Sequence, residues 1–403
     1  MNKIDLRQAK NSGGRRKQLE DGLEISLSNV GETPLDDSHF AGHCENAIGT
    51  TQIPLGVAGP LKIESGKWKI ENGYIPLATT EGALVASVNR GCKAVTSAGG
   101  VYVDVEKVGI SRGPVFKVDS VREGREVASW IDKHTSTLDA LAKETSSHIS
   151  LLSAQSQVVG KNLFVRFSFD TQDAMGMNMA TIATQTIVDA IEKEHNCRCV
   201  ALAGNFDIDK KPAWLNALYG RGYRVSAEVV IPKTTLKETL KADADSIVDV
   251  VYRKSHVGSM VSGSLGFNAH FANIVAALYA ATGQDLAHTV EGSLGITTAE
   301  AESNGDLYFS ITMPSVVVGT IGGGTSLPTQ KEALSILGIK DGKGEATKFA
   351  ALVGAAVLAG ELSLTASIAE GSLARTHDKF RKTKFEARST KSETSSNVIN
   401  SNT

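Results

Sequence analysis

Alternating and helically spaced apolar residues mark out a strand and a helix near the middle of the chain. From Leu163 to Phe169 every second residue is apolar, which is the pattern of a half-buried strand. From Met179 to Ile191 the apolar residues recur at the spacing of one helix face. Residues 173–179 lie between these elements and read Asp-Ala-Met-Gly-Met-Asn-Met. The sequence therefore predicts a strand, a polar turn and an amphipathic helix, in that order.

The turn at residues 173–179 has two interpretations. Amides at a helix start attract anions such as phosphate, and Gly176 would let the backbone approach a ligand closely. The methionines at 175, 177 and 179 could instead fill an irregular core, because methionine adapts to uneven gaps. Spacing alone favours core filling, so both interpretations stay open at this point.

A second helix is predicted from Glu81 to about Ala98. Thr80 is a suitable N-cap, and two glycines follow the last helical residue. One face carries the apolar side chains of Leu84, Val88, Cys92 and Val95. We expect this helix to lie buried in the centre of a large domain.

The elements between residues 113 and 204 follow the order β-α-β-β-α-β. The predicted strands cover 115–118, about 149–152, 163–169 and 199–203, and the helices cover about 127–141 and 179–191. This is the order of a ferredoxin-like sandwich. A strand at 224–231 and helices near 234–253, 270–282 and 347–374 follow it. We therefore expect an α+β fold in which a ferredoxin-like small domain is inserted into a larger domain.

The domain boundaries follow from these elements. The small domain is expected at residues 114–204, and the large domain at 21–113 together with 205–376. Residues 1–20 are polar, and the chain from about 384 onward lacks any apolar period. We therefore expect a flexible N-terminus at 1–20 and a mobile tail within 377–403.

Composition excludes several classes of protein. The chain has 403 residues, 41% of them hydrophobic, and a net charge of -2, which is typical of a globular protein without nucleic acid as its main partner. No run of about 18 apolar residues and no secretion leader stands out, so we expect no membrane segment and a cytoplasmic protein. The 4 cysteines do not form the two pairs of a zinc site, so free thiols and no metal are expected.

Polar residues at the ends of elements are the candidates for chemistry. Glu81 lies at a helix start, where the helix dipole favours a carboxylate, so a structural role is the usual case. A general acid at this position needs burial to raise its pKa. Asp285 follows a helix end, where the dipole disfavours an acid. Pro212 fixes Lys210 and Lys211 in a turn, where ammonium groups can hold an oxyanion. A solvated lysine pair is nevertheless the more frequent case.

Two further segments are weaker candidates. Gly319–Thr325 is rich in glycine and could bring amides to a ligand or form a tight turn, but it does not match the dinucleotide fingerprint of glycines. His377 follows the last apolar helix, and a single histidine carries little weight alone.

Taken together, these segments resemble the class I 3-hydroxy-3-methylglutaryl-coenzyme A (HMG-CoA) reductase family over residues 40–383. The family's motifs occur in its order at 45–49, 80–82, 173–179, 209–212 and 283–285. Residues Glu45–Gly49 resemble the motif through which the family forms dimers. Without a membrane segment, the chain is similar to the soluble microbial members.

The resemblance implies the NADPH-dependent reduction of HMG-CoA to mevalonate and coenzyme A by two hydride transfers. It assigns Lys210 to the oxyanion and His377 to the departing thiolate. Glu81 would protonate the aldehyde oxygen, and Asp285 would tune Glu81 and Lys210. The resemblance also implies a homo-oligomer, dimer or tetramer, with active sites at subunit interfaces.

The resemblance also implies binding residues. The contacts to coenzyme A would be Ser87, Asn89 and Arg90, and the contacts to the acyl portion Arg112, Lys211, Lys254 and Asn273. The contacts to NADPH would be Asp173, Gly176, Met177, Asn178 and Met179, with 318–325 as a second approach that includes Gly322, Gly323 and Thr325.

The chain departs from the family at two places. Ala203 stands where animal members have serine, which removes or replaces one hydrogen bond. The family's arginine for the 2′-phosphate of NADPH has no match at residues 146–148, so NADH is also possible.

Two other functions remain open. One is a coenzyme A-acylating aldehyde dehydrogenase that uses Cys44 or Cys92 as nucleophile. The other is a ligand-binding module without catalysis.

Overall fold

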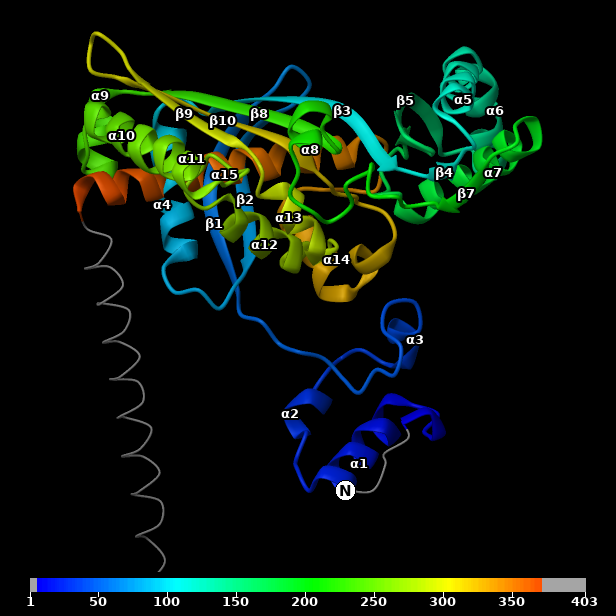
Figure 1. Ribbon diagram of the computed structural model, residues 1–403. Helices are drawn as coiled ribbons and strands as arrows, with labels where there is room; N and C mark the ends of the chain where they lie inside the picture. Colours follow the sequence, from blue (N-terminus) through cyan, green and yellow to red (C-terminus); the bar gives the residue numbers. More distant parts are fainter. Residues whose placement is uncertain (1–5, 372–403) are drawn as a thin grey trace, which may run out of the picture.

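Strand β3 (Val101–Arg112) joins the two parts of the molecule. The computed structural model describes residues 6–371. Within β3, residues 102–109 pair with β8 (Gly222–Ile231), whereas 110–112 pair with β6 (Asn162–Asp170). One strand therefore belongs to a large sheet at its start and to a smaller sheet at its end (Figure 1).

The large sheet has the order β2-β1-β3-β8-β10-β9. The added strands are β1 (Leu55–Glu64), β2 (Lys69–Ala78), β9 (Ile296–Ala301) and β10 (Leu307–Val316). Only β1 and β3 pair in parallel, and the other neighbours are antiparallel. On β10 every second side chain from Leu307 to Met313 is fully buried, which is the alternation expected of a strand with one face on the core.

The central helix of the large domain is α15 (Glu345–Glu370), which lies along the sheet (Figure 1). Every residue from Phe349 to Ser363 is buried. The prediction that the helix after Glu81 is central was wrong. That helix, α4 (Leu84–Ser97), buries only one face. It packs closely on α15 at Gly91, where an added Cβ atom would lie 1.8 Å from the Ala359 carbonyl oxygen. Glycine at 91 therefore permits the close contact.

Helix α15 is also apolar and long enough to cross a membrane, which the sequence analysis did not recognise. Of its most apolar window, 94% is buried inside the part of the chain that the structure describes. A helix that is apolar all round is typical of the core of a large domain.

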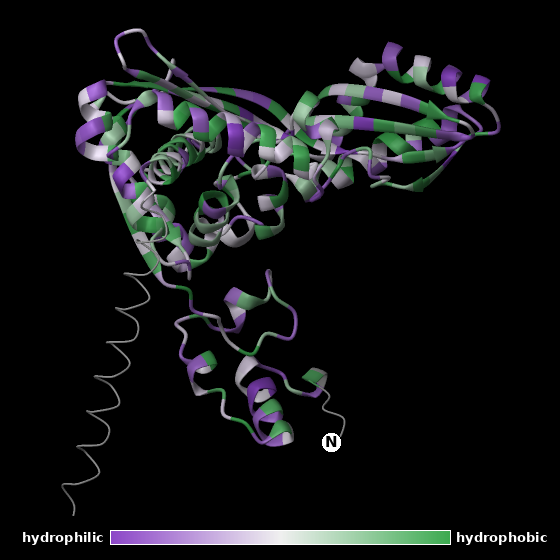
Figure 2. Cartoon of the chain, turned by 60° about the vertical axis from the view of Figure 1, so that its left-hand side comes forward, coloured by the Kyte–Doolittle hydropathy of each residue, from purple (hydrophilic) through white to green (hydrophobic). Residues whose placement is uncertain are grey.

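The small domain has the ferredoxin-like strand order β7-β4-β6-β5, as predicted. Its strands besides β6 are β4 (Val115–Lys117), β5 (Ser150–Val159) and β7 (Arg198–Ala201), and its helices are α5 (Val121–Lys133), α6 (Thr135–Thr145) and α7 (Met177–Glu194). Where one helix was predicted at 127–141, the chain breaks at His134 into α5 and α6. Both helices show mixed hydropathy in Figure 2, which fits one face on the sheet and one in solvent. The boundaries at 113 and 204 stay predictions.

The helix predicted near 234–253 is broken into short pieces. These are α9 (Lys233–Thr235), the π-helix η2 (Leu236–Leu240), α10 (Ala244–Val250), the π-helix η3 (Val251–Gly258) and α11 (Ser259–Ser262). Lys241 takes a positive φ of 58° that ends η2, and the Asp243 side chain accepts from the Ser246 amide to cap α10. The cap was not recognised in the sequence, so the break was missed.

Apart from the N-terminal helices, the described elements not yet named are short, with one exception. Helix α12 (Phe271–Thr282) confirms the prediction at 270–282, and the others are α8 (Trp214–Tyr219), α13 (Thr289–Gly292), α14 (Pro328–Ile336) and the 3-10 turns η1 (Leu6–Gln8), η4 (Leu286–His288) and η5 (Gly323–Ser326). Thr80 does not cap α4, because that helix begins only after Ala83, whose φ is 76°.

The N-terminal segment forms helices where none were predicted. These are α1 (Ser12–Leu23), α2 (Ser28–Gly31) and α3 (Asp37–Phe40), which lie below the large domain in Figure 1. Arg15 and Arg16 donate to the carbonyl oxygens of Ala47 and Ile48 at 2.7 and 2.9 Å. Such long-range contacts are invisible to an analysis of apolar periodicity, so α1 fell within the range expected to be flexible.

Candidate active site

The loop that carries Lys210 has an unusual backbone. Asn205, Ile208 and Lys210 have φ values of 66°, 49° and 56°, which are uncommon for residues other than glycine, above all for a β-branched one. The loop is held from the small-domain side: Ser111 Oγ donates to the Asp207 carbonyl at 2.9 Å, and Arg166 donates to the same oxygen at 3.0 Å. Surrounding contacts thus hold a strained loop in place, as is typical of functional sites.

Lys210 forms an ion pair with Asp285, which follows α12. Lys210 Nζ lies 2.7 Å from Asp285 Oδ2, and the two side chains are 39% and 34% exposed, so a ligand can reach them. Burial tends to raise the pKa of Asp285, but hydrogen bonds from Lys210 and the Ala287 amide outweigh it and hold that pKa below its usual value. The Asp285 carboxylate therefore stays ionised at neutral pH.

The Lys210–Asp285 pair predicts a pH dependence of stability. Since folding lowers the pKa of Asp285, the ion pair stabilises the folded state above the unfolded pKa of about 3.9 and is lost as the pH falls through the lowered value. We expect the difference in free energy of unfolding between wild type and Asp285→Asn to be constant down to about pH 4 and to vanish in stronger acid. Urea unfolding at several pH values measures it, and a difference that grew with acid would contradict the assignment.

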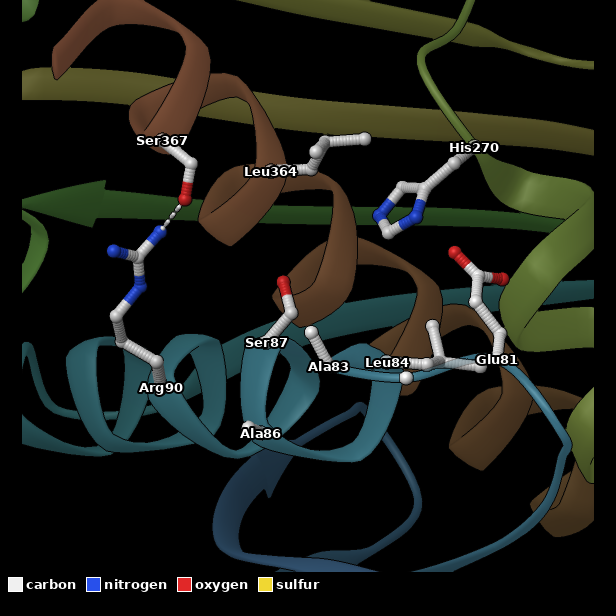
Figure 3. Close-up of a pocket in the computed structure, with 10 residues that line it drawn as sticks. Glu81, Ala83, Leu84, Ala86, Ser87, Arg90, His270, Leu364 and Ser367 are labelled. Atoms are coloured by element: carbon white, nitrogen blue, oxygen red, sulfur yellow. Dashed lines mark hydrogen bonds between the residues drawn. The ribbon is translucent and has the colours of Figure 1, made fainter. Parts of the chain in front are cut away.

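Glu81 lies in the loop before α4 and contacts α12. Asn273 Nδ2 donates to Glu81 Oε1 at 3.1 Å, and the Glu81 amide donates to Thr79 Oγ1 at 3.0 Å. Figure 3 shows the Glu81 carboxylate and the His270 ring on the same side of a cavity of about 200 Å³. The two groups come from segments far apart in the sequence.

Two predicted coenzyme A contacts line this same cavity. Ser87 Oγ donates to Ser363 Oγ at 3.1 Å, and Arg90 Nε donates to the same hydroxyl at 3.0 Å. Burial lowers the pKa of Arg90, although Glu370 partly offsets it. In Figure 3 the Arg90 guanidinium reaches toward Ser367 on α15. Both predicted residues therefore face α15 in this structure.

Asn89 is placed differently from its neighbours Ser87 and Arg90. Its Oδ1 accepts from the Gly59 amide at 3.0 Å, so the side chain holds a bend of β1 and does not line the cavity. Its role as a coenzyme A contact stays a prediction.

The predicted contacts to the acyl portion lie in two groups. Lys254, on the π-helix η3, and Asn273 share an open cleft of about 830 Å³ with Pro212. Arg112 instead donates to Thr181 Oγ1 at 2.7 and 2.9 Å and lies 3.5 Å from Asp207 Oδ2. The structure therefore brings Lys254 and Asn273 together, whereas Arg112 contacts Asp207 and Asp209 of the Lys210 loop and does not line this cleft.

Lys211 is exposed beside Lys210. Its Nζ donates to the Asp209 carbonyl oxygen at 3.1 Å. The adjacent Pro212 lines the same cleft as Lys254.

The two predicted cofactor segments line one cleft of about 690 Å³. Residues 174–179 and 321–325 both line it, and Asp285 lies in its wall. The segments are joined by a hydrogen bond from the Thr320 amide to the Asp173 carbonyl at 2.8 Å and by a bridge between Ala174 and Ile321. The turn at 173–179 thus forms one wall of a cavity and does more than fill the core.

Gly176 is required by the geometry at the start of α7. Its φ is 87°, and a Cβ atom there would lie 2.3 Å from the Thr171 side chain. Met177 is buried, and its sulfur lies 2.9 Å from Arg221 Nη2. The buried Met177 therefore fits the core-filling interpretation, and it also lines the cleft with its neighbours, whereas the anion-binding interpretation stays a prediction.

Asp173 faces away from this cleft. Its carboxylate accepts from the amides of Gly344 and Ala346 at 3.0 and 2.9 Å, and the side chain is buried. Asp173 therefore caps the start of α15 and supports the cleft from behind. His377, the fourth predicted catalytic residue, lies outside the described residues.

A buried group of charged residues was missed in the sequence analysis. Arg221, His288 and Glu291 are all fully buried, close to Asp209. Among the described residues, Asp209, His288 and Glu291 could reach one metal ion, but the Arg221 guanidinium already lies 3.0 Å from Asp209 and 2.9 Å from Glu291 and supplies the positive charge. The sequence offered one signal for this group: His288 and Glu291 are three residues apart, which is about one helical turn, and both follow shortly after Asp285.

His270 was also missed, although it lines two of the cavities described above. It follows Asn268 and Ala269 in the chain and lines both cavities. The Ala269 amide donates to Glu361 on α15 at 2.5 Å, and the His270 amide donates to the same carboxylate at 3.1 Å. A polar cluster just before the apolar helix α12 was the available signal.

Comparisons with known proteins agree with this arrangement. Residues 11–382 match the family model described as hydroxymethylglutaryl-coenzyme A reductase. The chain is 51% identical over 371 residues to the 3-hydroxy-3-methylglutaryl-coenzyme A reductase of Pyrococcus abyssi, covering 90% of each chain. It is 46% identical over 373 residues to the enzyme of Methanocaldococcus jannaschii, covering 91% of each.

A plant relative and a solved structure are also similar. The chain is 40% identical over 379 residues to 3-hydroxy-3-methylglutaryl coenzyme A reductase 1 of Cannabis sativa, covering 91% of this chain and 65% of the relative. The class II enzyme of Streptococcus pneumoniae, solved bound to NADPH in open conformations, has a TM-score of 0.67 at 17% identity, covering 90% of this chain and 98% of the other. This structure supports the fold.

Proposed function

The chain belongs to the hydroxymethylglutaryl-coenzyme A reductase family, and from this premise we propose that it reduces HMG-CoA to mevalonate and coenzyme A with NADPH. One observation carries the proposal: Asp285 lines the cleft formed by the two predicted cofactor segments and also pairs with Lys210 at 2.7 Å. A cation that stabilises an oxyanion must lie next to the hydride donor. The ion pair meets this requirement.

The cofactor cleft has the features that a dinucleotide needs. The start of α7 presents backbone amides at residues 177–179, and Gly176 leaves space beside them. Met175 and Met179 are half-buried at the same place, so apolar surface is available for a flat ring. NADPH supplies hydride when bound. The proposed contacts are Gly176, Asn178 and Met179 on one wall, with Gly322, Gly323 and Thr325 on the other.

The first reduction adds hydride to the thioester carbonyl carbon. The carbonyl π electrons move to oxygen, and Lys210 stabilises the resulting oxyanion by its positive charge. When this oxyanion collapses, the carbon–sulfur bond breaks and an aldehyde and coenzyme A thiolate form. The thiolate takes a proton, for which His377 is the proposed donor.

The second reduction adds hydride to the aldehyde carbon. The oxygen must then gain a proton to give the alcohol, and we propose Glu81 as its source. The protonated Glu81 carboxyl group would give this proton and become a carboxylate, and Asn273 orients the group by its hydrogen bond at 3.1 Å. Asp285 keeps Lys210 in place for both steps.

The test is a spectroscopic assay with purified protein, HMG-CoA and NADPH. We expect oxidation of two NADPH per mevalonate formed, with release of one coenzyme A thiol. Well-folded protein that oxidises no NADPH in the presence of HMG-CoA would refute the proposal. NADH tested in parallel identifies the cofactor: residues 146–148 offer no arginine to a 2′-phosphate, so its selectivity must come from other groups.

An acyl-enzyme on a cysteine is the competing mechanism, and Cys92 is its best-placed candidate on α4. Cys92 is fully buried, and burial raises the pKa of its thiol to about 12, so it is protonated and unreactive at neutral pH. We expect Cys92→Ala to lower the melting temperature but to leave kcat within about twofold of wild type. The other candidate nucleophile, Cys44, is exposed, and the Cys44→Ala variant is tested in the same assay. Loss of turnover in either folded variant would favour the dehydrogenase.

We also infer a cytoplasmic homo-oligomer with active sites at its interfaces. Within the motif at Glu45–Gly49, Arg15 and Arg16 hold the carbonyl oxygens of residues 47 and 48, and the exposed Glu45 and Asn46 are available to a second copy of the chain. Light scattering after size-exclusion chromatography tests the inference, and a monomer with full activity would contradict it.

A further inference from the structure

A buried ion pair lies directly behind the Lys210 loop. Arg221, which precedes β8, and Glu291, on α13, are both fully buried, and Arg221 Nη1 lies 2.9 Å from Glu291 Oε1. Buried ion pairs contribute little net stability, because removing charges from water costs about as much as their attraction returns. Stability alone therefore does not explain this ion pair, and its contacts indicate another role.

The pair contacts the backbone on which the catalytic lysine stands. Glu291 Oε1 accepts a hydrogen bond from the Lys210 amide at 2.7 Å. Arg221 Nη2 lies 3.0 Å from Asp209 Oδ1. Both residues of the 209–210 peptide are thus fixed by one buried pair. Lys210 has a φ of 56°, which is disfavoured for a residue with a side chain, and the bond to Glu291 offsets part of this cost.

The same group reaches the other half of the catalytic ion pair. His288 Nδ1 lies 3.4 Å from Glu291 Oε1, and its Nε2 lies 3.8 Å from Asp285 Oδ2. Lys210 and Asp285 are therefore both backed by the same buried cluster. No member of the cluster other than Asp209 is exposed enough to touch substrate.

We propose that Glu291 and Arg221 are positioning residues, which hold the Lys210 backbone so that its ammonium group meets the substrate oxyanion and Asp285 at once. The proposal rests on the reductase function proposed above. It assigns no chemical step to the pair. A misplacement of a catalytic group by about 1 Å can cost about 10²-fold in rate, so the effect on kcat is expected to be large.

Two variants that conserve charge test the proposal. Glu291→Asp keeps the negative charge but is one methylene shorter, so it withdraws the one oxygen that accepts from both the Lys210 amide and Arg221 Nη1. Arg221→Lys keeps a positive charge but cannot span Glu291 and Asp209 at the same time. We expect either variant to lower kcat at least about tenfold, with the KM for HMG-CoA and the affinity for NADPH within about threefold of wild type. A merely structural defect would weaken binding as well.

The matched control is Ile311→Val, a change in the large-domain core on β10, where the strand partners are Ala227 and Thr297. It should lower the melting temperature while leaving kcat unchanged. The positioning role requires that wild type oxidises NADPH and that the folded variants lose kcat. If either Glu291→Asp or Arg221→Lys folds and keeps a kcat within about twofold of wild type, the positioning role is refuted. Equal losses in kcat and in both affinities would refute it too. If wild type itself is inactive with HMG-CoA, the proposed reductase function has failed instead.

Discussion

Replacing Lys210 by alanine is expected to lower kcat by roughly 10²–10³-fold, the usual loss when one preorganised oxyanion donor is removed. The variant should bind NADPH normally, because the cofactor cleft is lined by residues 174–179 and 321–325 and not by Lys210. Steady-state kinetics with HMG-CoA and NADPH measure the loss. The KM for HMG-CoA should change less than kcat, since the lysine acts on charge that develops only in the transition state.

A matched control separates this role from a general effect of charge. Lys161 is exposed in the turn between β5 and β6, so Lys161→Ala removes the same charge far from the clefts. Its kcat should equal that of wild type. Retention of more than about a tenth of wild-type kcat by Lys210→Ala would remove Lys210 from the mechanism.

Glu81→Gln is expected to abolish the second reduction selectively. Glutamine keeps an oxygen that can accept from Asn273 at the 3.1 Å position but has no proton to give, so only general-acid catalysis is lost. General acids contribute about 10²–10⁴-fold, and we expect a loss of this size when mevaldehyde is supplied directly. Rapid-quench analysis of a single turnover with HMG-CoA should still show release of the coenzyme A thiol.

The control for this experiment is Glu64→Gln, on the exposed end of β1. It should reduce both HMG-CoA and mevaldehyde at the wild-type rate. If Glu81→Gln instead lost thiol release and kept aldehyde reduction, Glu81 would belong to the first step.

The sequence predicted elements well where the apolar period was local. The strand ending at Asp170 and the helix beginning at Met177 were found from alternation followed by helical spacing, and the ferredoxin-like order followed from counting such elements. Strands β1, β2 and β10 were missed because their apolar positions are interrupted by glycine, proline and serine, and they are stabilised by neighbours distant in the chain.

The site was only partly accessible to the same reasoning. Motifs and family resemblance pointed to Lys210, Asp285 and the turn at 173–179. The structure brings Asp285 and the turn to one cleft and pairs Lys210 with Asp285. The sequence could not show that the Asp173 carboxylate caps α15, because its partners lie about 170 residues away. It also could not show the buried pair behind Lys210, since a charged residue in a sequence is by default a surface residue.

The bulge in β3 has a consequence for the junction between the two domains. Pairing with β8 shifts register between Lys107 and Gly109, and pairing with β6 begins at the next residue, Ile110. Gly109 has a φ of 83°, and a Cβ atom there would lie 2.8 Å from the Phe169 carbonyl oxygen. A side chain at residue 109 would therefore disturb the point where β3 passes from the large sheet to the small one. The junction between the two domains is thus sensitive to one backbone torsion of a continuous strand.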